Sequence, residues 1–298
     1  MILIILLMTN NKLNDMPDCI WERIKCPPVN KQSQKIYNYI KYLNRIGIEK
    51  LKKKLTENHN IYSRKPLNII FIESTNIRNW DLSKINILNI TITNNNTITC
   101  FLFDILVDIN ILGDLVIRNN KNLTHLPESF GRIKVGRNLD LASNSINILP
   151  SSFGNIEVGR DLLLYNNGLK LLPNNFGNIK VGHTLHLGDN NLSKLPESFG
   201  KIKVHGDLLL SMNPLNCLPK SFGNIEVGCS LAMSNTKLQY LPKNFGSIKI
   251  GCDLHLTGNN FQNFPKSFEN LNIKTLILCK NPSITYKYLP TVGKICFL

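Results

Sequence analysis

Three residues with metal-binding or nucleophilic side chains recur at one spacing. Cys229 and Cys252 are 23 residues apart, and His183 precedes Cys229 by twice that interval. A structural zinc site needs four such ligands at one point. Residues at a constant interval in a repeating chain line up along the molecule and do not converge. We therefore expect no metal site, and predict that Cys229 and Cys252 are a neighbouring pair of half-buried thiols.

The sequence holds none of the short motifs that bring a nucleophile, a base and an orienting group together. A glycine-rich phosphate loop, H-E-x-x-H and G-x-S-x-G are all missing. Most glycines recur at the same interval as the cysteines, which is typical of turn residues. The sequence thus predicts no catalytic residue, no cofactor and no small-molecule substrate, and we expect that the protein is not an enzyme.

Two sets of mostly charged residues recur every 23 positions. Neighbours in the first set mostly alternate in sign and should neutralise one another across strands; the set is Lys134, Glu157, Lys180, Lys203, Glu226 and Lys249. The second set starts at Glu128 and ends in three lysines, which repel one another unless an anion lies across them. These candidate anion-binding residues, for which a solvated edge is the alternative, are Lys220, Lys243 and Lys266.

These intervals come from an internal repeat. Seven blocks of 23 residues open with Leu-Pro or Phe-Pro; they start at Leu126, Leu149, Leu172, Leu195, Leu218, Leu241 and Phe264. A fixed period of this size is the signature of a solenoid, in which each unit buries its apolar face against the next.

Residues 162–169 show what the positions of a block do, since they read L-x-L-x-x-N-x-L. Alternation predicts a short strand with Leu162 and Leu164 inward and Leu163 outward. Asn167 ends the strand, and its amide can bond the bending backbone and stack on the Asn of the next block.

The outward positions of these strands carry tyrosine and leucine among charged residues. That mixture is typical of a protein-binding surface, although surface left over once the core is filled is an equally good interpretation. The candidate partner-binding residues are Asp161, Leu163, Tyr165, His186, Asp189, Asp207, Leu209, Asp253 and His255.

The second half of each block alternates too, with Ile156 and Val158 inward and Glu157 outward. β-branched residues and the glycine that follows favour an extended return limb over a helix. The expected fold class is α/β to mainly β, a solenoid with a parallel strand sheet, a largely extended convex side and a short N-terminal helical cap.

The blocks and their L-x-L-x-x-N-x-L core resemble the leucine-rich repeat family over about three quarters of the chain. The L-P-x-S-F-G-N-I-K-V-G variant is similar to repeats of giant-DNA-virus (Mimivirus-like) proteins, and 42 asparagines fit an AT-rich genome of that kind. The resemblance implies a curved scaffold that binds protein partners and does no chemistry itself. Glycine replaces the first consensus leucine in most blocks, which predicts a flatter stack.

We divide the chain into three parts. Residues 66–285 form the repeat array, because weaker copies of the strand precede the seven blocks, and residues 286–298 form a C-terminal tail. Residues 1–65 form an N-terminal cap with 13 Lys and Arg against 5 Asp and Glu. Within the cap, residues 1–20 match the repeat template and are interpreted as an isolated repeat or a strand resembling one, and the basic residues 31–57 have helical spacing.

The start of the chain also resembles an F-box, which opens L-P-x-E-I-x-x-x-I. Met16, Ile20 and Ile24 match, whereas Cys19 replaces the Glu and Pro27 interrupts the expected helix. F-boxes joined to leucine-rich repeats imply substrate adaptors of ubiquitin ligases. Whether residues 13–60 form an F-box-like module or a capping helix stays open.

The composition indicates the compartment and the partners of the protein. Eight scattered cysteines favour a reducing compartment, and the apolar start lacks the basic region and cleavage site of a signal peptide. We expect an intracellular monomer, in a host cytoplasm, without a transmembrane segment and with a protein partner. The net charge of +15 leaves one further alternative, which is binding of nucleic acid or acidic lipid through the Lys-rich residues 41–65. Nucleic acid is disfavoured because aromatic residues are too sparse there for a stacking platform.

Overall fold

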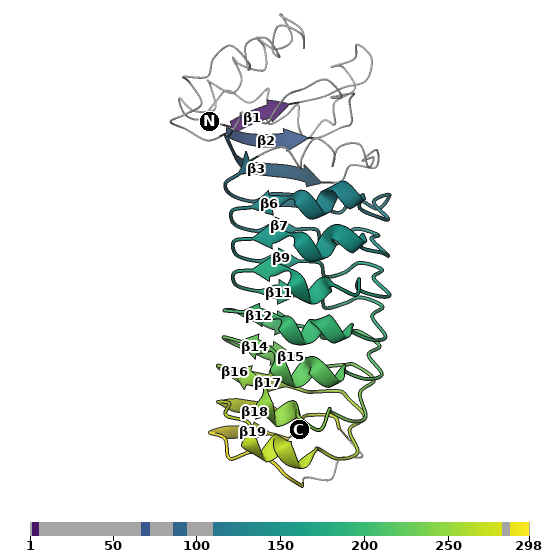
Figure 1. The fold of residues 1–298 in the computed structure, drawn as a ribbon, viewed down its shortest axis with the longest axis vertical. Coiled ribbons are helices and arrows are strands. Elements are labelled where there is room, and N and C mark those ends of the chain that lie inside the picture. Colours follow the sequence, from purple (N-terminus) through teal and green to yellow (C-terminus); the bar gives the residue numbers. More distant parts are fainter. Residues whose placement is uncertain (1, 6–66, 72–85, 94–109, 282–286, 298) are drawn as a thin grey trace, which may run out of the picture.

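The computed structural model describes residues 2–5, 67–71, 86–93, 110–281 and 287–297. These residues form an elongated column of stacked coils, which runs without a strong bend in the view of Figure 1. The predicted basic helix at 31–57 and the F-box-like residues 16–24 lie outside the described residues, as does most of the predicted isolated repeat at 1–20.

Each coil adds one short strand to a parallel ladder that follows the whole column, which confirms the predicted sheet. Neighbouring strands pair in register, one coil apart. In spatial order the strands of this first ladder are β1 (Ile2–Ile5), β2 (Leu67–Phe71), β3 (Asn86–Thr93), β5 (Leu115–Arg118), β7 (Leu139–Asp140), β9 (Leu162–Leu163), β11 (Leu185–His186), β13 (Leu208–Leu209), β15 (Leu231–Ala232), β17 (Asp253–His255), β18 (Thr275–Ile277) and β19 (Lys294–Cys296).

A second ladder of two-residue strands comes from the return limbs. Its strands are β4 (Asn110–Ile111), β6 (Lys134–Val135), β8 (Glu157–Val158), β10 (Lys180–Val181), β12 (Lys203–Val204), β14 (Glu226–Val227) and β16 (Lys249–Ile250). Strand β3 is long enough to pair with both β4 and β5, so the two ladders diverge from it. Ile156 and Val158 are buried and Glu157 is partly exposed, which confirms the alternation predicted for this limb.

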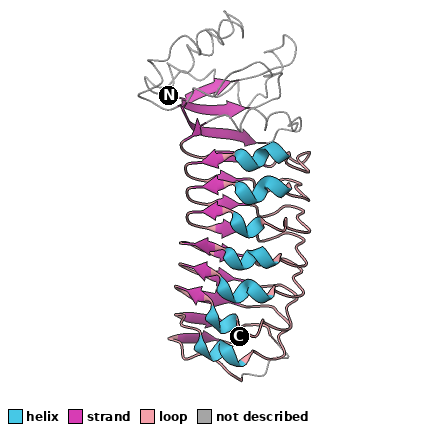
Figure 2. Ribbon diagram, viewed as in Figure 1, coloured by secondary structure: helices cyan, strands magenta, loops and turns pink. Residues whose placement is uncertain are grey.

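One turn of 3-10 helix precedes each of the strands β6, β8, β10, β12, β14 and β16, a feature that the alternation did not predict. In the block at Leu149, Pro150 has φ −64° and its carbonyl accepts the N–H of Phe153 at 3.0 Å, which closes the turn. Figure 2 shows these turns in a row beside the strands. They are η2 (Glu128–Arg132), η3 (Ser151–Asn155), η4 (Phe176–Asn178), η5 (Glu197–Lys201), η6 (Lys220–Asn224), η7 (Phe245–Ser247) and η8 (Lys266–Asn270).

None of these turns approaches the length of a membrane-spanning helix, and no other helix in the described part of the chain does. The convex side is therefore made of single 3-10 turns and extended pairs.

The core is a set of stacked columns of identical side chains. The inward leucines of the first ladder are fully buried. Behind them lies a column of phenylalanine rings, one per coil, whose centroids are 5.9 to 6.1 Å apart; these are Phe130, Phe153, Phe176, Phe199, Phe222, Phe245 and Phe268. Because every coil contributes the same shapes, each layer of the core fills the layer beside it.

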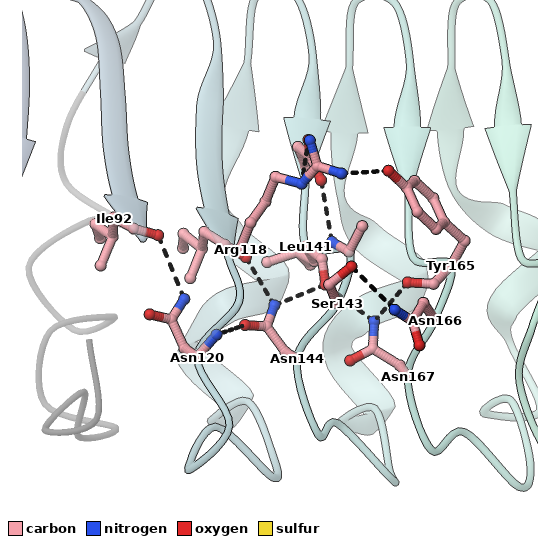
Figure 3. Close-up of polar contacts among 12 residues, drawn as sticks. Ile92, Arg118, Asn120, Leu141, Ser143, Asn144, Tyr165, Asn166 and Asn167 are labelled. Atoms are coloured by element: carbon pink, nitrogen blue, oxygen red, sulfur yellow. Dashed lines mark hydrogen bonds and ion pairs between the residues drawn. The ribbon is translucent and has the colours of Figure 1, made fainter. Parts of the chain in front are cut away.

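An asparagine ladder holds the turns after the strands from β5 to β18, with Thr236 in place of asparagine after β15. The side-chain amide of Asn190 donates to the carbonyls of Leu164 and Leu187, both at 3.0 Å, and its oxygen accepts the N–H of Leu169 at 3.2 Å. The same pattern at Asn144 and Asn167 is drawn in Figure 3. The predicted bonding of this asparagine to the bending backbone is confirmed, since one buried amide satisfies backbone groups of two coils.

The column of glycines that replaces the consensus leucine lies where successive coils touch. A Cβ built on Gly159 would overlap the carbonyl oxygen of Gly136, and one built on Gly182 would overlap that of Gly159. The amide of Gly159 donates to Val135 at 2.8 Å, so the close approach accompanies the coil-to-coil hydrogen bond. Glycine is required here because backbone occupies the place of a side chain.

His205 takes the glycine position in one coil, and the second ladder breaks there. Strands β10 and β12 do not pair, and this is the one such step among the described strands of that ladder. The imidazole Nδ1 of His205 lies 2.8 Å from the carbonyl oxygen of Gly182 and must donate, because a carbonyl only accepts. A side-chain bond thus replaces the backbone contact that a Cβ excludes.

We expect Gly159→Ala to destabilise the protein by about 1–3 kcal/mol, because the new methyl group would force two backbones apart. Urea unfolding midpoints measure this effect. Gly168→Ala is the matched control: its Cβ would find the nearest atom at 3.7 Å, so a change within about 0.5 kcal/mol is expected. Equal losses in the two variants would contradict the close-contact explanation.

Candidate protein-binding face

The outward side chains of the first ladder form a continuous surface, which we call the strand face. Its central row follows the register of the strands and comprises Val116, Asp140, Leu163, His186, Leu209, Ala232, His255 and Ile277. Asp140 is buried, and the other side chains in this row are half-buried. The row is therefore mostly apolar, with enough exposed surface to contact another molecule.

A polar cluster occupies the N-terminal part of the strand face. Nε of Arg118 lies 3.3 Å from a carboxylate oxygen of Asp140, and the Arg118 guanidinium donates to the hydroxyl of Tyr165 (Figure 3). The guanidinium carbon is also 5.6 Å from the centroid of the Tyr165 ring, within cation–π range. Arg118 thus holds a carboxylate from the next coil and an aromatic ring from the coil beyond it.

Burial shifts the pKa of two residues at this cluster, Asp140 and His186. Burial raises the pKa of Asp140 above its usual range, although a hydrogen bond from the N–H of Ala142 and the charge of Arg118 act in the opposite direction. The Tyr165 and His186 rings lie 4.5 Å apart between centroids, and burial lowers the pKa of His186. His186 Nδ1 accepts the N–H of Gly188 at 3.2 Å, which also suits a neutral imidazole.

Two of the predicted partner-binding aspartates make hydrogen bonds within the solenoid. The Asp161 carboxylate accepts the N–H of Thr184 at 3.0 Å and lies 3.0 Å from Nδ1 of His183. The Asp207 carboxylate accepts the N–H of Ser230 at 2.9 Å. Both aspartates therefore link one coil to the next at the edge of the strand face.

The remaining predicted residues fall in two places. Asp253 and His255 lie half-buried on β17, and His255 belongs to the central row. Asp189 is exposed in the turn after β11 and has φ +52°. That conformation recurs at the residue before each ladder asparagine, where Asn, Asp and Gly are favoured. Asp189 therefore lies beyond the strands, at the margin of the strand face.

The alternating charge set pairs as the sequence predicts. Glu157 lies 3.4 Å from Lys134 and 2.8 Å from Lys180, and hydrogen bonds from Lys180 and Lys134 keep its pKa below the usual range. Glu226 pairs with its two lysine neighbours, Lys203 and Lys249, in the same way. The one unpaired step, from Lys180 to Lys203, coincides with the break in the second ladder.

The predicted anion-binding lysines are exposed at the starts of two 3-10 turns and just before a third. Glu197, one coil before Lys220, uses its carboxylate to accept the N–H groups of Lys220 and Ser221. Lys220 therefore has an acidic side chain beside it, which weakens its attraction for an external anion. An anion site across Lys220, Lys243 and Lys266 stays a prediction.

The predicted thiol pair is present. The Cys229 and Cys252 sulfurs lie 3.5 Å apart, and both residues are half-buried. In the part of the chain that the structure describes, no three His, Cys, Asp or Glu side chains gather as a metal site would require.

Sequence reasoning missed the two charged members of the cluster, Arg118 and Asp140. Asp140 lies one period before Leu163 and so could have been assigned to the central row. Arg118 lies in a coil that precedes the regular blocks, where no period aligns it. Its contact with Tyr165 spans two coils, a distance that an interval of 23 residues does not reveal.

Comparison with known proteins places the fold. No protein-family model matches the sequence, and neither does any curated protein. Among solved structures, the chain is similar to the leucine-rich repeat ectodomain of the plant membrane receptor kinase GASSHO1/SCHENGEN3 from Arabidopsis thaliana, with a TM-score of 0.54 and 23% identity. This match covers 73% of the present chain and only 27% of the receptor chain.

The fold is a leucine-rich repeat solenoid. Matches also include a leucine-rich repeat protein of Leptospira interrogans (TM-score 0.27, 19% identity, 77% of this chain and 87% of that one) and YopM from Yersinia enterocolitica (TM-score 0.37, 21% identity, 62% and 39%). At these identities the likeness concerns the fold alone. Any binding role of this leucine-rich repeat solenoid must therefore be argued from its own residues.

The lowered pKa of His186 predicts how the stability of the strand face depends on pH. The folded state favours the neutral imidazole. The contribution of His186 to the free energy of unfolding is therefore fully present above the ordinary histidine pKa of about 6.5, and it is lost as the pH falls below that value. Between about pH 7.5 and about pH 5.5, the free energy of unfolding measured in urea should therefore fall more in the wild type than in His186→Gln. The same substitution at His255, three coils away in the same row, controls for removal of an imidazole. A pH dependence unchanged in His186→Gln would refute the assignment.

Proposed function

We propose that this protein is a non-enzymatic scaffold that binds a protein partner across the strand face. The packing of Tyr165 carries the proposal. Its ring lies between the Arg118 guanidinium and the His186 imidazole, and the residue stays partly exposed. An aromatic ring held in this way is ready to contact a partner.

The energetics of binding favour this part of the molecule. Tyrosine and arginine are enriched among the residues that dominate binding energy, and a ring that is already fixed loses little conformational entropy on binding. The apolar residues Leu163, Leu209 and Ile277 lie along the same row, half-exposed. A partner that covers them would gain the free energy of removing apolar surface from water.

The strand edge beside this row is less suited to partner contact. Asp161 and Asp207 already accept backbone hydrogen bonds, so a partner would compete with the solenoid for them. We therefore centre the proposed interface on Tyr165, His186 and Leu209, with Asp253 and His255 towards the C-terminal end.

Fold neighbours support a binding role in general terms. The Arabidopsis receptor ectodomain was solved in complex with CASPARIAN STRIP INTEGRITY FACTOR 2. A more specific proposal rests on the sequence alone. Because the repeat variant resembles repeats of giant-virus proteins, we propose a monomeric viral scaffold that binds host or viral proteins in the host cytoplasm. The F-box-like adaptor and the basic anion-binding segment fall outside the described residues and stay alternatives.

The proposal is tested by site-specific photo-crosslinking in cells that produce the full chain. A benzophenone amino acid in place of Leu209, on the strand face, should crosslink a defined protein. The same amino acid in place of Asn224, exposed at the end of η6, should not crosslink that protein. The captured partner is then purified, and its affinity for each variant is measured.

Tyr165→Ala should weaken that affinity by about tenfold or more, since removing a central interface aromatic has effects of that size. Leu209→Glu should act in the same direction, and Asn224→Glu should bind like the wild type. Thermal unfolding confirms that each variant is folded. A partner that crosslinks equally from positions 209 and 224, and binds all three variants equally, would overturn the strand-face proposal.

A further inference from the structure

A pair of thiols and a lysine lie in three successive coils beside the strand face. Cys229, Cys252 and Lys274 hold equivalent positions, each two residues before the first inward leucine of its strand. The amide of Cys252 donates to the carbonyl of Cys229 at 2.9 Å, and that of Lys274 to Cys252 at 2.7 Å. The backbone register therefore stacks these side chains directly over one another.

The spacing of the coils is compatible with a disulfide. Neighbouring parallel strands are about 4.8 Å apart, and the Cα atoms of disulfides are about 4.4–6.8 Å apart. The two sulfurs are already 3.5 Å apart, so a bond of about 2.05 Å needs a small rotation of two half-exposed side chains.

The surroundings make the two thiols unequal. Nζ of Lys274 lies 3.7 Å from the sulfur of Cys252, where its charge complements a thiolate. Cys229 donates its S–H to Cys252, and this hydrogen bond is the main cause that raises the pKa of the Cys229 thiol. The carboxylate of Asp207 also raises it. Cys252 is thus the better nucleophile, and Cys229 is the neighbouring thiol that can react second.

We propose that Cys229 and Cys252 form a reversible inter-coil disulfide by exchange with a small-molecule disulfide such as oxidised glutathione, with Cys252 attacking first. Cys252 loses its proton, and its sulfur forms a bond to one glutathione sulfur as the glutathione disulfide breaks and releases one thiolate. The Cys229 sulfur, having lost its proton, then attacks the Cys252 sulfur and releases the second glutathione thiolate. The protein gives up two electrons and two protons, and the glutathione disulfide becomes two reduced molecules.

The bond would join two coils at the edge of the strand face. It would close a loop of one repeat and restrict the unfolded chain, so the oxidised protein should unfold at a higher temperature. Asp207, which accepts the N–H of Ser230 next to Cys229, lies at the same place. Oxidation would thereby fix the edge of the proposed interface, although the thiol exchange itself does not depend on the strand-face proposal.

The test incubates the folded full-length chain with oxidised glutathione, blocks free thiols and maps disulfides by mass spectrometry. The expected product links the peptides of Cys229 and Cys252 and is reversed by reduced glutathione. Cys229→Ser should stop at one glutathione on Cys252, whereas Cys217→Ser, which removes an exposed thiol elsewhere, should leave the link intact.

A rate measurement separates the role of Lys274 from that of mere proximity. Lys274→Met should slow the first step by about threefold to tenfold, as expected for removing one charge near a partly exposed sulfur. Lys170→Met, which removes an equal charge from an exposed position in another coil, should leave the rate unchanged. Glutathione on Cys217 without a Cys229–Cys252 link in the wild type would overturn the proposal. Equal rates in the two lysine variants would overturn the part assigned to Lys274.

Discussion

Each coil of this solenoid lies against the previous coil through backbone hydrogen bonds made in register, and the other contacts depend on that approach. In the second ladder the backbones of successive coils lie so close that a side chain at Gly159 or Gly182 would overlap a carbonyl oxygen of the neighbouring coil. The phenylalanine column and the asparagine ladder repeat once per coil as well. Apolar packing and amide hydrogen bonds therefore stabilise the same displacement between one coil and the next. At His205 a Cβ is present, the pairing of β10 with β12 is lost, and an imidazole bond takes its place.

The same translation builds the proposed binding surface. Residues 23 positions apart become neighbours, so a polar side chain meets its partner from another coil more often than from its own. Tyr165 is held by an arginine two coils away and by a histidine in the next coil. Cys229 and Cys252 meet in the same manner. The strand face thus combines a rigid backbone with side chains whose positions are fixed by neighbours on both sides, and such preorganisation lowers the entropy cost of binding.

Features that follow from a single translation could be predicted from the sequence. The strand sheet, the asparagine bonds, the Lys–Glu pairs and the thiol contact all require only that equivalent positions stack. Features that depend on side-chain direction could not. The period does not show that Asp161 turns towards Thr184, that Pro150 and Phe153 close a 3-10 turn, or that Arg118 reaches across two coils. Nor does it show that His205 interrupts a backbone contact, since glycine at the other positions had suggested a flatter stack and not a steric limit.

Backbone hydrogen bonds made in register hold the coils together, and among the described strands of the second ladder they are interrupted only between β10 and β12, at His205. Hydrogen exchange of single amides, followed by NMR, tests this dependence on backbone contact. The amides of Gly159, Gly182, Gly228 and Gly251, which donate to the preceding coil, should exchange slowly, and the amide of His205 should exchange much faster while Leu208 beside it stays protected. Slow exchange at His205, equal to that of the glycines, would contradict the account, as would fast exchange throughout the glycine column.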